Sequence, residues 1–335
     1  FVSVLQECTD NLRTRYALDL ALTTLVDING GVHKPDGLDL KALADIARES
    51  RPASDIPGWT FDLTDKNAIE LTSAKIMIEA TPTNIETAEP ALSHFRWAIS
   101  RGIHVVTLAK GPLVRAFGEL RSLAEATGVA MKVSGATAAA LPTVDVGAYC
   151  LAGANILHFM GILNGTSNYI LTQMFYENMT YQEALASAQA MGIAEPDPSL
   201  DVGGWDTACK TAILANVLMG SELTIDDVSV RGIAGIDSKW ITEAKKRGCT
   251  IKLVGEARRE GANIELSVQP VEMPKDHALA SVNGTVKAIT FETDTMGSLT
   301  IIGGASARRA AAAAALKDVI NLCVMLRGGM YSPFT

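Results

Sequence analysis

The sequence predicts an α/β fold, with a doubly wound parallel sheet in the first part of the chain and an α+β arrangement in the rest. Three observations lead to this fold class. Short apolar segments alternate with helical patterns through the first 135 residues, small residues dominate from Ser134 onward in SGATAAALPT, and later apolar segments follow one another at hairpin spacing. A length of 335 residues is also more typical of two domains than of one.

Apolar periodicity predicts the elements of the first part in order. Helices are expected over residues 1–16, 38–47, 87–100 and 112–127, and strands over 21–27, 75–80, 103–107 and 129–133. Strands separated by helices of this length need crossover connections. The economical arrangement is therefore a parallel sheet covered by helices on both faces.

The second part is predicted to contain a mixed or antiparallel sheet. Its strands are expected near residues 156–163, 250–257, 264–268, 286–291 and 299–302. A helix is expected over 204–218, and a last helix over 306–325, where six consecutive alanines favour helix by propensity alone.

A dinucleotide-binding sheet of this type normally begins with a strand and a G-x-G-x-x-G turn, and the phosphates lie on the N-terminus of the next helix. This chain begins inside that helix, and its first glycine, Gly30, comes too late for such a turn. We therefore expect that a first strand and glycine loop precede Phe1 in the natural protein and are absent from this sequence.

Charge and composition favour a small-molecule substrate. The formal net charge of −8, from 29 basic and 37 acidic residues, disfavours nucleic acid and anionic membranes as main partners. No uncharged apolar run reaches the roughly 18 residues that a membrane helix needs. The five cysteines form no C-x-x-C pair and the first residues do not resemble a signal peptide, so a reducing, cytoplasmic location is expected.

The densest group of polar residues lies in IAEPDPSLDVGGWDTACK, residues 193–210. Asp206 and Lys210 stand four residues apart on a predicted helix and share one face. Spacing alone favours an exposed ion pair. The apolar TAILANVLMG that follows indicates partial burial, and a buried lysine beside a carboxylate is a candidate acid/base. Glu195 and Asp206 are equally suited to neutralise a substrate ammonium.

Further candidate residues follow predicted strands. Lys110 comes after the strand at 103–107, the sequence EATPTN closes the strand at 75–80, and Asp27 closes ALTTLVD where a ribose-binding acid is expected. Ligands bind at the carboxyl ends of strands in parallel α/β sheets, although a solvated loop lysine is an equally simple interpretation of Lys110.

The sequence GILNGTSNY ends another predicted strand at a predicted helix start. Backbone N–H groups at Gly165 and Thr166 would suit a carboxylate ligand. An ordinary Asn-Gly turn with a threonine cap explains the same residues.

Taken together, these stretches resemble the homoserine dehydrogenase family over nearly the whole chain. The matching sequences are LVDINGG, IEATPTN, VVTLAKGPL, GILNGTSNYIL, EALASAQAMGIAEPDPSLDVGGWDTACK, IKLVGEA and GSLTIIGG. The resemblance implies a Rossmann-like dinucleotide-binding domain made of residues 1–135 with 304–335, and a substrate-binding and dimerisation domain over 136–303. It also implies a homodimer.

The family interconverts L-homoserine and L-aspartate 4-semialdehyde with NAD or NADP, in the biosynthesis of threonine, isoleucine and methionine. By resemblance, Lys210 is the acid/base, Asp206 orients the substrate, and Lys110 is a second catalytic or positioning lysine beside the nicotinamide. Substrate-binding roles are implied for Glu195, Asp201, Thr166 and Gly165. Cofactor-binding roles are implied for Asp27, Thr81, Pro82, Lys110 and Gly303.

The resemblance further implies a monovalent cation such as sodium, held by the main-chain carbonyls of Thr137, Ala139 and Leu141. The chain also departs from the family pattern. Ala109 stands where an asparagine usually precedes the lysine, and Gly303-Gly304-Ala305-Ser306-Ala307 replaces GPGAG. Two alternatives to homoserine dehydrogenase are a cofactor-incompetent relative that acts as a scaffold and a dehydrogenase of another small amino acid or aldehyde.

Overall fold

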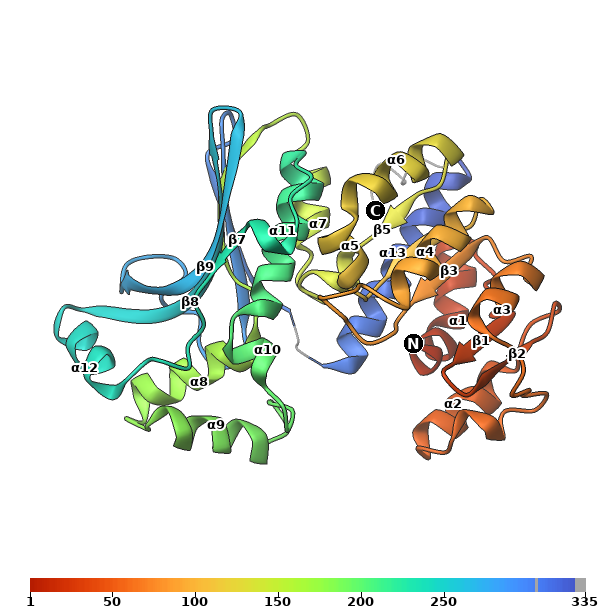
Figure 1. Ribbon diagram of the computed structural model, residues 1–335, viewed down its shortest axis with the longest axis horizontal. Helices are drawn as coiled ribbons and strands as arrows, with labels where there is room; N and C mark the ends of the chain where they lie inside the picture. The colour runs from red at the N-terminus through yellow and green to blue at the C-terminus, as the bar shows by residue number, and fades with distance from the viewer. Residues whose placement is uncertain (305–306, 329–335) are drawn as a thin grey trace.

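Two separate sheets organise the chain, which the computed structural model describes over residues 1–304 and 307–328 (Figure 1). The first sheet is parallel and consists of β3 (Ile76–Glu79), β4 (His104–Thr107) and β5 (Met131–Lys132). The second has six strands and lies beside it in the view of Figure 1. The predicted combination of a parallel sheet and a mixed sheet is confirmed.

Helices cover both faces of the parallel sheet. Val105 and Val106 are adjacent in β4 and point to opposite faces. Val105 lies in the core that contains residues of α4 (Ala91–Ser100) and α6 (Phe117–Thr127), whereas Val106 packs with residues of α13 (Arg308–Leu326). This is the doubly wound arrangement that the alternation of strands and helices predicts.

One predicted strand lies outside this sheet. The segment expected as a strand over 21–27 contributes β1 (Thr24–Asp27), which pairs antiparallel with β2 (Gly30–His33) as a separate hairpin. The cause is local, because Asp27 pairs with Gly30 and leaves only a two-residue loop. Asp27 Oδ1 accepts a hydrogen bond from the Asn29 N–H at 2.7 Å inside that turn. The expectation that Asp27 ends a strand of the parallel sheet is therefore wrong.

We call residues 1–133 together with α13, which surround the parallel sheet, the first unit, and residues 134–303, which surround the six-stranded sheet, the second unit. The remaining elements of the first unit differ modestly from the prediction. The helix expected over 112–127 is interrupted at Ala116, where φ is −140°, and α5 precedes α6. The helix α3 (Asp65–Leu71) is not among the predicted elements, and its N-cap is the Thr64 hydroxyl, which accepts from the Asn67 N–H. The other helices of this unit are α1 (Val2–Tyr16), α2 (Leu40–Arg48), α3 (Asp65–Leu71) and α5 (Gly111–Arg115), with a 3₁₀ turn at η1 (Ala53–Asp55).

The six-stranded sheet has the order β11-β10-β6-β8-β9-β7, antiparallel except between β7 and β9. Its strands are β6 (Ile156–Ile162), β7 (Val228–Val230), β8 (Cys249–Glu260), β9 (Asn263–Pro274), β10 (Lys287–Thr293) and β11 (Ser298–Gly303). The short edge strand β7 was not predicted. Three helices pack against β8, namely α8 (Gly165–Tyr176), α11 (Trp205–Met219) and α12 (Ser238–Lys246).

The helices of the second unit begin with α7, which a π-helical turn over Val146–Cys150 extends. They are α7 (Thr143–Asp145), α8 (Gly165–Tyr176), α9 (Tyr181–Ala190), α10 (Ser199–Val202), α11 (Trp205–Met219) and α12 (Ser238–Lys246). Two 3₁₀ turns, η2 (Ser134–Ala136) and η4 (Ile225–Asp227), complete the elements.

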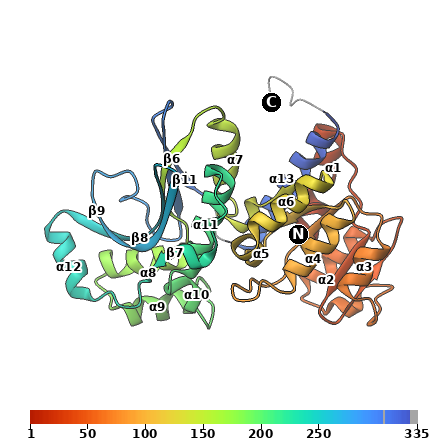
Figure 2. The ribbon, with the colours of Figure 1, turned by 45° about the horizontal axis from the view of Figure 1, so that its top comes forward.

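The last helix returns to the first unit. Figure 2 shows α13 beside α1, and Ala312 and Leu316 share a buried cluster with Leu5 and Leu12 of α1. The boundaries predicted for the two domains stay a prediction, and the predicted helix start at Ser306 and residues 329–335 lie outside the described residues. Among the helices that the structure describes, none combines the length and apolar character needed to cross a bilayer.

A buried ionic network holds the end of β3 to two helices. His94 of α4 lies between two carboxylates, with Nδ1 2.7 Å from Glu79 Oε2 and Nε2 2.5 Å from Asp65 Oδ2. Glu79 also accepts from the N–H and the hydroxyl of Thr81. Burial alone would lower the pKa of His94, but Glu79 and Asp65 outweigh it and raise the pKa. Burial would raise the pKa of both carboxyls, and their hydrogen bonds to His94 instead lower it.

Replacing His94 with glutamine should therefore destabilise the protein in a pH-dependent way. The raised pKa of His94 makes its stabilisation complete below the ordinary value of 6.5, and the stabilisation is lost as pH rises through the folded pKa. The contribution of Asp65 and Glu79 to the free energy of unfolding is lost as pH falls through their lowered pKa values. Urea unfolding of wild type and His94→Gln should differ most, by about 1.5–3 kcal/mol, near pH 6, and the difference should shrink as pH rises through the raised pKa of His94. A difference that stays constant with pH would contradict a charged His94.

Candidate active site

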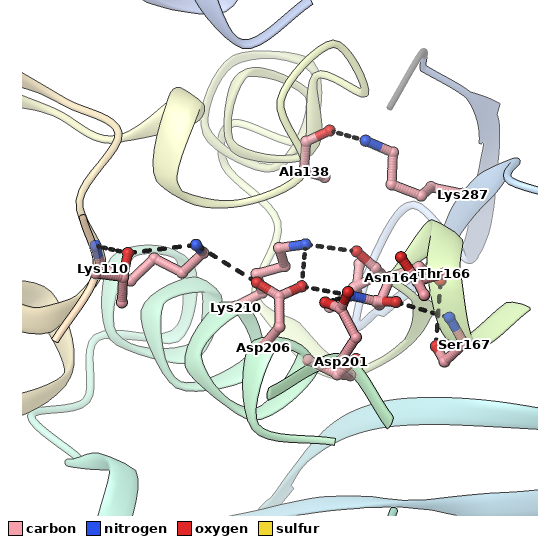
Figure 3. A network of polar contacts seen from close by, with 12 residues as sticks. Lys110, Ala138, Asn164, Thr166, Ser167, Asp201, Asp206, Lys210 and Lys287 are labelled. Atoms are coloured by element: carbon pink, nitrogen blue, oxygen red, sulfur yellow. Dashed lines mark hydrogen bonds and ion pairs between the residues drawn. The ribbon is translucent and has the colours of Figure 1, made fainter. Parts of the chain in front are cut away.

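The densest polar cluster lies where the two units meet. Asp206, in the first turn of α11, binds two ammonium groups that come from different units (Figure 3). Asp206 Oδ2 lies 2.6 Å from Lys210 Nζ, and Asp206 Oδ1 lies 3.4 Å from Lys110 Nζ. The three side chains are at most 20% exposed. The sequence candidates Lys110, Asp206 and Lys210 thus share one site, and the exposed ion pair that spacing favoured is a largely buried one.

Local sequence determines how α11 enters this site. Gly204 precedes the helix with φ of +85°, a left-handed conformation that favours glycine. A Cβ atom there would also lie 3.2 Å from Val230 and Val268. The predicted i,i+4 spacing then places Asp206 and Lys210 on the same face of the helix, and the apolar remainder of α11 is buried against the second sheet.

Asn164 connects this cluster to the start of α8. Its Oδ1 accepts from the Ser167 N–H at 2.8 Å and caps the helix. Its Nδ2 donates to Asp201 Oδ1 at 2.6 Å and to Asp206 Oδ2 at 2.8 Å. The prediction assigned the cap to threonine and left Asn164 out of the candidate residues. The sequence signal was available, because asparagine is among the best N-cap residues.

The pKa values of the two neighbouring carboxyls, Asp201 and Asp206, are shifted in opposite directions. Burial alone would raise the pKa of Asp206, but the ammonium groups of Lys210 and Lys110 outweigh it and hold that pKa well below its usual range. For Asp201, burial and the charge of Asp206 raise the pKa, and the hydrogen bond from Asn164 offsets them only in part. Asp206 is therefore a permanent anion at the centre of the site.

Lys210 is oriented by two acceptors. Its Nζ donates to Asp206 Oδ2 and to the Leu163 carbonyl oxygen at 2.8 Å. An ammonium group has three donors, so these two acceptors leave a third N–H available for a ligand. Leu163 immediately follows β6, which places this donor at the start of α8.

The substrate candidates Gly165 and Thr166 lie at the start of α8, the end of the site where the Lys210 ammonium lies. Glu195 is not part of this cluster. Gly165 and Thr166 form the first turn of α8, and the Thr166 hydroxyl donates to the Ile193 carbonyl at 3.2 Å. The Glu195 side chain is exposed and makes no hydrogen bond or ion pair with any residue that the structure describes.

Two of the cofactor candidates, Thr81 and Pro82, lie on the first unit's side of the site. Thr81 and Pro82 follow β3, and the next residue, Thr83, accepts from Lys110 Nζ at 3.5 Å. A small cavity beside Lys110 is lined by Thr83, Ile85, Lys110, Leu200, Trp205, Asp206 and Cys209. Gly303 ends β11, and Asp27 remains in its separate hairpin. Within the described residues no group of acid, histidine and cysteine side chains is arranged to hold a metal.

Lys287 is a residue of the site that the sequence did not reveal. It belongs to β10, is 3% exposed, and its Nζ donates to the Ala138 carbonyl at 2.7 Å (Figure 3). Burial and the Lys210 ammonium lower the pKa of Lys287 to about 8, although Asp206 opposes them. The only sequence signal is a single lysine within the apolar run VKAITF, which does not identify its partner.

Comparisons with known proteins agree on one family. A family model described as homoserine dehydrogenase matches residues 142–320. The NAD(+)-dependent homoserine dehydrogenase of Pseudomonas canavaninivorans is 36% identical, covering 95% of this chain and 91% of the relative. A crystal structure from Archaeoglobus fulgidus has a TM-score of 0.85 and 32% identity, covering 96% of this chain and 94% of that chain. A hyperthermophilic archaeal homoserine dehydrogenase mutant in complex with NADPH shares the fold, with a TM-score of 0.83 and 23% identity over 97% of this chain and 94% of that chain.

Asp206→Asn should destabilise the fold, because two buried ammonium groups lose their carboxylate while the side chain keeps its size. We expect a loss of about 3 kcal/mol in the free energy of unfolding. Asp201→Asn is the matched control, since Asp201 is a carboxyl whose charge its surroundings oppose and asparagine still accepts from Asn164. Denaturant unfolding should rank Asp206→Asn far below Asp201→Asn, and equal losses would refute the difference between these carboxyls.

Proposed function

The chain belongs to the homoserine dehydrogenase family, and we propose that Lys110, Asp206 and Lys210 form the centre at which it interconverts L-homoserine and L-aspartate 4-semialdehyde. The observation that carries this proposal is one carboxylate bound by an ammonium group from each unit. Such an arrangement joins the end of a strand of the parallel sheet, where cofactors bind, to a helix of the second unit.

The strand ends fit the nicotinamide half of NAD or NADP. Thr81, Pro82 and Lys110 stand at the carboxyl ends of β3 and β4, and the Cβ position of Gly303 is open space. When bound, the cofactor accepts a hydride from the homoserine carbon or returns it to the semialdehyde. A relative named as NAD(+)-dependent and a similar fold solved with NADPH support both cofactors. Asp27, exposed at the turn of its hairpin, remains a proposed ribose contact that only its sequence position supports.

We assign the proton transfer to Lys210. In the direction of reduction, its third N–H donates a proton to the substrate oxygen as that oxygen gains negative charge. In the direction of oxidation, Lys210 accepts the hydroxyl proton, which it can do only as a neutral amine. Asp206 and the Leu163 carbonyl fix the direction of the amine, and Lys110 shares the carboxylate from the cofactor side.

The amino-acid part of the substrate is proposed to lie at the start of α8. Backbone N–H groups of Gly165 and Thr166 at a helix N-terminus suit the α-carboxylate. Glu195 is proposed to bind the α-ammonium, because its loop is attached to α8 by the hydrogen bond between Thr166 and Ile193. Asp201 is proposed to border the same pocket, where Asn164 binds it.

We further propose a homodimer formed through the second unit, as the family resemblance implies, and a reducing cytoplasmic location, which five free thiols suit. The retained cluster favours a working dehydrogenase over a scaffold protein. A scaffold would gain nothing from burying two lysines around one carboxylate, which costs desolvation energy.

Lys210→Ala should lower kcat for homoserine oxidation by about 10²–10⁴-fold and leave the dissociation constant of NAD(P)H nearly unchanged, because only the proton carrier is removed. Steady-state kinetics and fluorescence titration of NAD(P)H measure the two quantities. Lys246→Ala, on the exposed side of α12, is the control and should behave as wild type. Near-normal turnover by Lys210→Ala would remove the assignment.

Glu195→Gln should raise the KM for homoserine by about tenfold or more, since the substrate ammonium loses its countercharge at constant side-chain size. Asp197→Asn tests the same loop without this role, because Asp197 accepts from the Ser199 N–H within the turn. Kinetics at saturating cofactor should separate the two variants, and an unchanged KM in Glu195→Gln would exclude the proposed contact.

A further inference from the structure

The chain crosses from the first unit to the second through a connecting segment, residues 134–141, and Lys287 is bound to it. The Lys287 ammonium donates to the carbonyl of Ala138, and both residues are almost fully buried. In Figure 3 this pair lies beside the cluster of Lys210 and Asp206. A buried ammonium group requires electronegative partners. The connecting segment must therefore hold the Ala138 carbonyl where it can accept from Lys287.

The return crossing of the chain passes at the same place. Lys287 pairs across the sheet with Gly303 of β11, the last strand before the return. At Gly304, where φ is +76°, an added Cβ atom would lie 2.5 Å from the Leu141 nitrogen. The two connections between the units are therefore in contact, and the Lys287 ammonium lies where they meet.

Carbonyl groups at the start, middle and end of the connecting segment accept hydrogen bonds from protein donors. Ser134 accepts from the N–H and the hydroxyl of Thr137, at 3.3 and 3.0 Å. Ala138 accepts from the Leu141 N–H at 3.2 Å as well as from Lys287, and Leu141 accepts from the Thr143 N–H at 2.8 Å. Of the three carbonyls expected to bind a monovalent cation, that of Leu141 thus already accepts an N–H, and those of Thr137 and Ala139 belong to the two residues on either side of Ala138, whose carbonyl binds an ammonium.

The charges of the segment disfavour a second cation. Residues 135–141 read GATAAAL and contain no acid. At the start of the segment, the carboxylates of Asp145 and Asp318 are already bound to a cation, the Lys317 ammonium, whose Nζ also donates to Ser134 Oγ at 2.9 Å. A metal ion on the carbonyls next to Ala138 would lie close to the Lys287 ammonium in a region shielded from water, where like charges repel most strongly. The segment thus does not fit the expected sodium ion.

We propose that the Lys287 ammonium supplies, from within the chain, the positive charge that a monovalent metal ion was expected to supply at the connecting segment. An alkali cation and a lysine ammonium carry the same charge, and carbonyl oxygens stabilise both. The native protein therefore needs neither sodium nor potassium to hold its two units together, and loss of the lysine creates a cation requirement.

Thermal unfolding in different salts tests this proposal independently of catalysis. The natural protein, Lys287→Met and Lys252→Met are compared at one pH near 7 in sodium, potassium and N-methylglucamine chlorides of equal ionic strength, so that screening is the same. Lys252 is the matched control, because it is a buried lysine of β8 bound to Asn168, Asn283 and the Val282 carbonyl, away from the connecting segment.

The wild-type Tm should be the same in all three salts. The Tm of Lys287→Met should fall by several degrees in N-methylglucamine and rise again, with a saturable concentration dependence, in sodium or potassium. Lys252→Met should be destabilised equally in every salt. A saturable increase of the wild-type Tm with sodium or potassium, or a Lys287→Met variant as indifferent to the cation as Lys252→Met, would overturn the proposal. If Lys287→Met folds in no salt, sodium-23 relaxation of the wild type decides, and saturable binding is then the contradicting result.

Discussion

The arrangement of the site depends on one carboxylate that two lysines share. Burying an ammonium group without a partner is costly, and this protein buries two beside each other where its units meet. Asp206 makes this possible because its two oxygens face different units, Oδ1 toward Lys110 and Oδ2 toward Lys210. Asn164 then orients the carboxylate from the start of α8. Removing any one of these groups would leave the others with unpaired charges or hydrogen-bonding groups.

The same contacts connect fold and chemistry. Lys110 follows β4 of the parallel sheet, and Lys210 lies on the helix that packs against β8 of the second sheet. The distance between the cofactor side and the substrate side is thus set by an ion pair and by the two chain connections that Lys287 and Gly304 bring together. Dehydrogenase chemistry requires such accuracy, because the substrate carbon and the proton carrier must both be aligned with the nicotinamide.

Much of this could be predicted from the sequence where the signals are local. The i,i+4 spacing of Asp206 and Lys210, followed by an apolar run, predicted a partly buried pair on one helix face, and the alternation of strands and helices predicted the doubly wound sheet. The strand that ends at Asp27 does not join the parallel sheet, because the two-residue turn that follows it pairs Asp27 with Gly30 in a local hairpin. The contact of Lys287 could not be predicted, because its partner Ala138 is 149 residues away in the sequence. Every residue also has a main-chain carbonyl, so the residue type does not show which one accepts the hydrogen bond. The Glu195 side chain is exposed and contacts none of the clustered residues. Its proposed role in substrate binding therefore rests on the family resemblance.

The ion pair between Lys110 of the first unit and Asp206 of the second makes these two side chains functionally dependent on each other. A double-mutant cycle on kcat/KM for homoserine, with Lys110→Met, Asp206→Asn and the double variant, measures their coupling directly. The shared carboxylate predicts strong non-additivity, with the double variant scarcely slower than Asp206→Asn alone. Losses that simply multiply would show that the two side chains act independently and would contradict this account.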